Sequence, residues 1–243
     1  MNIIGTLGSR ADIFQDAYSG LNKLCHMNNT SIRMVKNDFF TVQDLFIKNG
    51  HAQEFYDRTV KLTDEMEAKG KTSLSKLLLN ELCKLSMNFR LRDNPEKILY
   101  KAISTYNKNG DGFHELARIN DLQNLYKQGC SQQDYYKVLR MKKNCCMKIL
   151  KDYEGNVVRF ASISRPPTSR DGVKHQLAHT FSQIALLLSD TKPKEATNAL
   201  IMSKQLYEEI GKFDVAQIIE RRINHAEFNG NIRRGGLRPR DYR

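Results

Sequence analysis

The sequence has no long hydrophobic run and no recognisable export signal. No stretch approaches the roughly 20 consecutive apolar residues that a helix needs to cross a bilayer. The N-terminus lacks a basic segment followed by an apolar core, which a secretory signal would have. We therefore expect a cytoplasmic protein without membrane contact.

Cysteine is scarce, and its spacing does not suggest a cross-linked or metal-bound framework. The five cysteines are Cys25, Cys83, Cys130, Cys145 and Cys146. Their number is odd and no two are spaced as C-x-x-C, which argues against a disulfide framework and a zinc site. We expect free thiols in a reducing compartment.

Motifs that carry catalysis are also missing. The chain contains no G-x-x-x-x-G-K-[ST], G-x-G-x-x-G, H-E-x-x-H or G-x-S-x-G. His175 and His179 lie four residues apart, a spacing that places two imidazoles on one helix face, but no third ligand is indicated nearby. We therefore predict a protein that is not an enzyme, with no catalytic residue, cofactor or bound metal.

Helical periodicity is the strongest positive signal. Apolar residues recur at helical spacing, and no run of β-branched or aromatic residues alternates with polar ones in a way that would make a sheet. The pattern predicts an all-α protein with helices at about 10–26, 38–48, 51–69, 73–91, 95–109, 113–128, 132–153, 173–189, 194–210 and 213–228. Pro95 and Pro193 are placed to begin helices, and Gly110, Gly129 and Gly211 are placed to end them.

Breaks in this pattern divide the chain into four parts. Residues 1–154 form an N-terminal helical part, and 155–172 form an exposed loop that contains Pro166 and Pro167. Residues 173–230 form a C-terminal hairpin with a capping helix. Residues 231–243 form a flexible basic tail with five arginines and one acid. The net charge of +12 is otherwise spread thinly, as on solvated helix faces.

The order of large and small side chains in 173–189 and 194–210 carries a family resemblance. The first helix has a large, large, small, large pattern and the second has small, large, small, at Phe181, Ile184, Ala185, Leu188, Ala196, Leu200 and Ser203. This pattern resembles the tetratricopeptide-like helical-hairpin repeats over about 95–228. The segments ending at Gly110 and Gly211 share a helix-ending sequence 101 residues apart, near three 34-residue periods. In the pair 113–128 and 132–153, Gln123 and Lys142 occupy positions where the family has small residues.

The resemblance implies stacked antiparallel helical hairpins in a tetratricopeptide-like α-solenoid, and a scaffold or adaptor that binds a protein or peptide. By position in the family pattern, the inner face that binds the partner would be lined by Asn120, Asn124, Lys127, His179, Gln183 and Leu186. The side-chain amides among them suit hydrogen bonding to an extended peptide backbone. The alternative is that these polar side chains are simply solvated.

Two other functions stay open. Arginines bind phosphates and stack on bases, so the tail would suit RNA or an acidic partner through Arg233, Arg234, Arg238, Arg240 and Arg243. The protein would then be an RNA- or nucleoprotein-associated α-solenoid. Alternatively, the apolar segments 10–26 and 38–48 pair with another copy in an assembly. The sequence does not define the oligomeric state.

Overall fold

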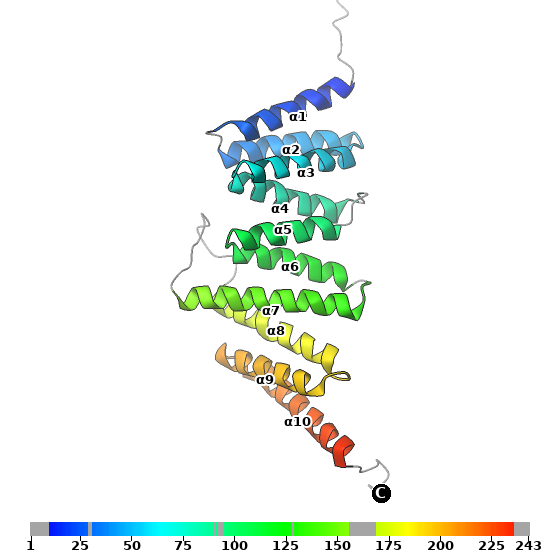
Figure 1. The fold of residues 1–243 in the computed structure, drawn as a ribbon, viewed down its shortest axis with the longest axis vertical. Coiled ribbons are helices and arrows are strands. Elements are labelled where there is room, and N and C mark those ends of the chain that lie inside the picture. The colour runs from blue at the N-terminus through cyan, green and yellow to red at the C-terminus, as the bar shows by residue number, and fades with distance from the viewer. Residues whose placement is uncertain are drawn as a thin grey trace, which may run out of the picture. The chain divides into compact units, whose positions relative to one another are not determined.

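The computed structural model describes residues 10–28, 31–89, 91, 95–127, 129–155 and 169–235. Over these ranges the protein is all-α, with ten helices and no strand (Figure 1). The helices are α1 Arg10–His26, α2 Ile32–Lys48, α3 Ala52–Ala68, α4 Thr72–Asn88, α5 Pro95–Lys108, α6 Gly112–Tyr126, α7 Gln132–Glu154, α8 Arg170–Leu188, α9 Pro193–Glu209 and α10 Phe213–Gly235. None of these described helices is long and apolar enough to span a membrane.

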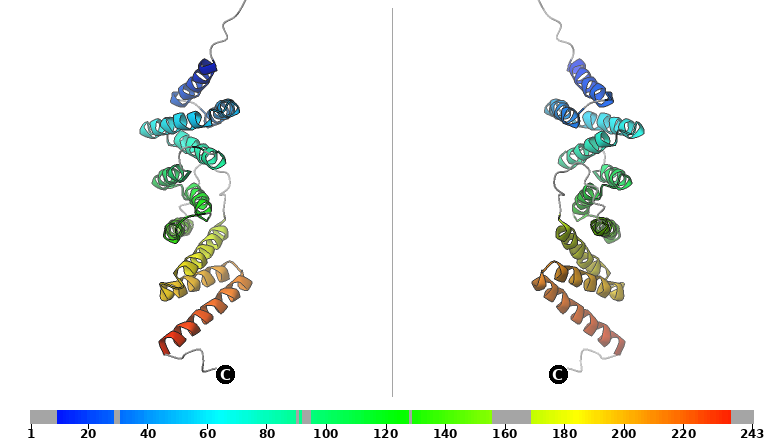
Figure 2. Two further views of the ribbon diagram at one scale, coloured as in Figure 1. Left: turned by 90° about the vertical axis from the view of Figure 1, so that its right-hand side faces the viewer. Right: turned by 90° about the vertical axis from the view of Figure 1, so that its left-hand side faces the viewer.

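The chain divides into two compact units, residues 1–105 (unit 1) and 106–243 (unit 2). In unit 1, α1 packs on α2, α2 on α3, and α3 on α4. In unit 2, consecutive helices from α6 to α10 pack on one another, and α8, α9 and α10 run back and forth as antiparallel neighbours (Figure 2). Each unit is therefore a helical-repeat solenoid, as the periodicity predicts. Most of the predicted loop 155–172 lies outside the described residues.

Three helix ends differ from the predicted ones. Helix α2 begins at Ile32 rather than 38, because the Ser31 hydroxyl accepts a hydrogen bond from the Met34 N–H at 3.2 Å and caps the helix. Helix α8 begins at Arg170, where Ser169 caps it in the same way. Helix α10 continues to Gly235, beyond the predicted end at 228.

The extended α10 corrects the prediction that the whole segment 231–243 is without a helix. The backbone of Arg233 and Arg234 belongs to α10. Arg238, Arg240 and Arg243 lie outside the described residues.

Four hairpin turns share one backbone arrangement. Gly50, Gly70, Gly110 and Gly211 adopt φ between 68° and 80°, the left-handed region that glycine enters without strain. In each turn, the N–H after the glycine donates to the carbonyl of a residue at the helix end: His51 to Phe46, Lys71 to Met66, Asp111 to Tyr106 and Lys212 to Tyr207, at 2.8–2.9 Å. This confirms the predicted helix-ending roles of Gly110 and Gly211. The residue before Gly129 lies outside the described range.

The spacing of these turns differs from a 34-residue repeat. Buried residues at helix ends follow one another at positions 46, 66, 86, 106 and 126, so a two-helix unit takes about 40 residues in this part. The described residues between Tyr106 and Tyr207 form four helices, α6 to α9, where three tetratricopeptide repeats would form six. The 34-residue interpretation of that interval is therefore wrong, because the 23-residue α7 and the segment after it add length.

Unit 1 buries most of the aromatic residues that suggested an assembly role. The ring centroids of Phe14 and Phe46 are 5.0 Å apart, and those of Phe39 and Phe55 are 5.1 Å apart. All four rings are buried, and Phe40 is the one exposed aromatic side chain among the described residues of segments 10–26 and 38–48. Packing inside unit 1 accounts for the apolar character of these two segments.

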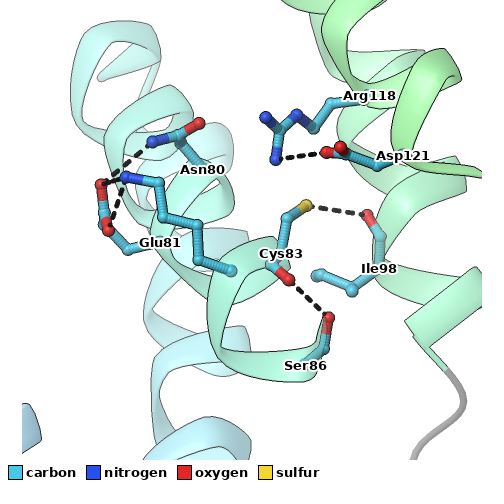
Figure 3. A network of polar contacts seen from close by, with 8 residues as sticks. Asn80, Glu81, Cys83, Ser86, Ile98, Arg118 and Asp121 are labelled. Atoms are coloured by element: carbon cyan, nitrogen blue, oxygen red, sulfur yellow. Dashed lines mark hydrogen bonds and ion pairs between the residues drawn. The ribbon is translucent and has the colours of Figure 1, made fainter. Parts of the chain in front are cut away.

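Helix α4 of unit 1 carries a buried carboxylate. Glu81 accepts hydrogen bonds from the Lys84 ammonium at 2.9 and 3.1 Å and from the Asn80 amide at 3.0 Å (Figure 3). At the start of α4, the Lys71 ammonium donates to the carbonyls of residues 25, 26 and 27, at 2.9, 2.8 and 2.9 Å. Lys71 therefore satisfies carbonyls that the end of α1 leaves without helical partners.

Small residues bring α8 and α9 together in unit 2. Ala185 and Ser203 are both buried, as predicted for the crossing of these helices. The Ser203 hydroxyl donates to the Ala178 carbonyl at 2.7 Å, which requires close approach of the two backbones. The size pattern of this hairpin thus matches its packing.

Candidate protein-binding site

Unit 2 carries matched polar stripes on α6 and α8. Asn120 and Gln123 of α6 and Lys127, the residue that caps its C-terminus, follow at intervals of three and four residues, so they share one face. On α8, Gln176, His179 and Gln183 follow the same rule. Hydrogen bonds between the two stripes place them at the same side of unit 2.

Gln123 is the centre of this polar network. Its side chain is 3% exposed, and within the described residues it forms hydrogen bonds to side chains of two other helices. Its amide N–H groups donate to the Gln183 carbonyl at 2.9 Å and to the Tyr135 hydroxyl at 3.1 Å. Its carbonyl oxygen accepts from the Lys142 ammonium at 2.9 Å. Gln123 therefore joins α6, α7 and α8 through one amide.

Two further bonds extend the network toward solvent. The Asn120 amide donates to the Gln176 carbonyl at 3.1 Å, and the Gln183 amide donates to the Tyr135 hydroxyl at 3.2 Å. These four side chains are half-buried. They cover the Gln123 amide and form the surface between α6 and α8.

Lys142 brings a positive charge under this surface. The residue is 6% exposed, and burial lowers the pKa of its ammonium below that of a free lysine. Burial also raises the pKa of the neighbouring Cys146 thiol to about 12, so this thiol stays protonated near neutral pH and does not compensate the charge. An ammonium group has three N–H donors, and Lys142 makes one hydrogen bond within the described residues.

Lys127 adds a second cationic group at the exposed side, and His179 adds an imidazole ring. Burial, and then the charges of Lys142 and Lys127, lower the pKa of His179, so the three groups lie within electrostatic range of one another. Ion pairs of α6 and α7 are formed by other residues, among them Arg118–Asp121, Lys137–Asp134 and Lys148–Glu115. In the described part of unit 2, Lys127 and Lys142 have no carboxylate partner.

The structure brings together most of the residues expected at the inner face. Asn120 and Gln183 belong to the hydrogen-bond network, and Lys127 and His179 border it. Asn124 is exposed one position from Gln123 on α6. Leu186 is 65% exposed and lies one turn beyond Gln183 on α8. None of these positions tests whether a partner binds.

Sequence reasoning missed four members of the network, which are Gln123, Tyr135, Lys142 and Gln176. Gln123 and Lys142 had a usable signal, since both interrupt the small or apolar positions of a helix stripe in neighbouring helices. When two polar residues interrupt the apolar positions of neighbouring helices in a predicted hairpin, the pattern indicates that they form a hydrogen bond with each other. Tyr135 and Gln176 offered no such signal.

The His175–His179 pair does not gather further ligands. His175 packs edge-on against Tyr207, with ring centroids 5.6 Å apart. In the part of the chain that the structure describes, no cluster of three or more His, Cys, Asp or Glu side chains could hold a metal ion.

Comparison with other proteins gives no family for this chain. No family model matches it, and no curated protein sequence matches it. Among solved structures, the crystal structure of BtubC (BKLC) from P. vanneervenii aligns with a TM-score of 0.41 at 12% identity, over 96% of this chain and 93% of that chain. The DHF58 filament aligns with a TM-score of 0.31 at 12% identity, over 90% of this chain and 96% of that chain.

Proposed function

We propose that this protein is a non-catalytic scaffold or adaptor that binds a protein partner as an extended peptide segment on the polar face of α6 and α8. The observation that supports this is the shared network in which Gln123 joins the amides of both helices to α7. A network that fixes side chains in place reduces the entropy lost when they bind a ligand. The tetratricopeptide-like pattern of 95–228 points to the same face.

The exposed members of the face supply the contacts. Asn124 offers one amide donor and acceptor set to a peptide backbone, and His179 offers a ring nitrogen. Leu186, 65% exposed, offers an apolar contact at the end of the face. This mixture of amide, imidazole and apolar groups suits a peptide with backbone and side chains both engaged.

Selection of binding peptides tests the proposal. Peptides selected by phage display on the full chain should bind in solution, and Asn124→Ala with His179→Ala should weaken them about tenfold or more. Asn198 is an exposed asparagine on α9, so Asn198→Ala is a matched control that should leave binding unchanged. Selected peptides that bind the double variant as tightly as the parent would place binding elsewhere and reject the proposal.

A second candidate, RNA binding, has one observation in its favour. Arg140, Lys143 and Lys151 follow one side of α7, and no carboxylate pairs with them among the described residues. With the arginines near the C-terminus they would offer a phosphate-binding surface. Binding to a single-stranded oligonucleotide at an ionic strength of about 0.15 M, with an affinity that falls steeply as salt rises, would support this candidate.

A further inference from the structure

We propose that the α6–α8 face selects an acidic peptide, and that it binds a glutamate or aspartate side chain between Lys127 and His179, above the buried charge of Lys142. This inference rests on the proposed function and adds the chemical class of the partner. It is carried by two cationic groups of one face, Lys127 and Lys142, that have no carboxylate partner among the described residues, and by the His179 ring on the same face.

Burial makes the charge of Lys142 unusually effective. Two charges interact more strongly where protein rather than water separates them, and salt screens a buried charge less than an exposed one. Lys142 is 6% exposed and its ammonium donates to a neutral amide, which does not cancel its charge. Its field therefore extends to the surface above it.

Lys127 and His179 provide the direct contacts to the bound carboxylate. Both side chains are exposed, on α6 and α8 respectively, and both are free of carboxylates in the described structure. A hydrogen bond between a charged donor and a carboxylate is about twice as strong as one between neutral groups. The site is thus exposed to solvent at Lys127 and His179, and the charge of Lys142 lies buried below them.

The test uses two fluorescein-labelled peptides, one of alternating serine and glutamate and one of alternating serine and glutamine. Their binding to the full chain is measured by fluorescence anisotropy at an ionic strength of about 0.15 M. The glutamate peptide should bind about tenfold more tightly or better. Lys127→Ala and Lys142→Met should each remove most of this preference while leaving the weak binding of the glutamine peptide unchanged.

A matched control separates the site from general attraction between opposite charges. Lys143→Met removes the same charge from the next position of α7 and should keep the preference for glutamate. Because Lys142→Met leaves the Gln123 carbonyl without its donor, the double variant Gln123→Leu with Lys142→Met provides a second protein that lacks the charge. It should also lose the preference.

Several results would overturn the inference. Equal binding of the two peptides to the parent would leave the peptide-binding proposal standing and remove the acidic specificity. An equal loss with Lys143→Met would show attraction to net charge alone. Tighter binding of an oligouridine than of the glutamate peptide, lost in Lys142→Met, would assign the site to nucleic acid instead.

Discussion

The pair Gln123 and Lys142 allows a quantitative test of how the network stabilises unit 2. Gln123→Leu removes the acceptor of the hydrogen bond that Lys142, a lysine only 6% exposed, makes within the described residues. A hydrogen bond to a charged group contributes roughly 1.5–3 kcal/mol, so we expect the free energy of unfolding to fall by about 2–3 kcal/mol. The Tyr135 hydroxyl and Gln183 amide remain bonded to each other at 3.2 Å and are half-buried, so their losses add little.

The double variant Gln123→Leu with Lys142→Met should recover most of that loss. Replacing both partners of a buried polar pair by apolar side chains of similar shape is often nearly neutral, so we expect stability within about 1 kcal/mol of the parent. The two substitutions should therefore couple by about 2 kcal/mol in a double-mutant cycle.

Urea denaturation followed by far-ultraviolet circular dichroism measures the free energies, and amide hydrogen exchange locates the change in α6 to α8. Asn120→Leu is the control, because its bond to Gln176 lies among half-buried side chains and its loss should cost less than about 1 kcal/mol. Additive effects of the two central substitutions, or a Gln123→Leu variant as stable as the parent, would refute the reasoning.

Three other predictions follow from packing and charge. Ala185→Leu should destabilise unit 2 by about 1–3 kcal/mol in thermal or urea unfolding, because a larger side chain enters the buried α8–α9 crossing; an unchanged melting temperature would contradict this. Gly112→Ala should also destabilise, since its Cβ would lie 2.7 Å from an Ile149 side-chain carbon, while Gly20→Ala in open space on α1 should stabilise by about 0.5–1 kcal/mol in the same assay. Because the pKa of Lys142 is lowered, the unfolded chain holds that proton more tightly, so the parent should gain stability relative to Lys142→Met as pH rises toward about 10.4. If the difference in stability between parent and variant stays constant with pH, the pKa of Lys142 is the same in the folded and unfolded states and the prediction is wrong.

The sequence predicted helices better than it predicted their ends and their functional contacts. Apolar periodicity and helix-breaking residues are local signals, so helices such as α9, which begins at Pro193, were found directly. Ser31 shows the limit of this approach, because a single hydroxyl that accepts from the Met34 N–H fixes where α2 begins, ahead of the buried stripe of Val35 and Phe39.

The network consists of contacts between residues that are far apart in the sequence, and no local pattern encodes such contacts. Gln123 and Gln183 are 60 residues apart, and their pairing depends on how α7 and α8 stack. The family pattern identified Gln183 and Asn120 as residues of the inner face, because each lies on the inner side of the first helix of its hairpin. It treated Gln123 and Lys142 as exceptions, although their burial as a pair is what joins the three helices.

The repeated glycine turns have a consequence for how the chain folds. The helix pairs that pack extensively in the described structure are neighbours in sequence or are separated by one helix. Contacts of short sequence separation close small loops, which lose little entropy, and proteins built from them fold fast. Each hairpin can therefore form as soon as its second helix has left the ribosome, before the rest of its unit has been synthesised.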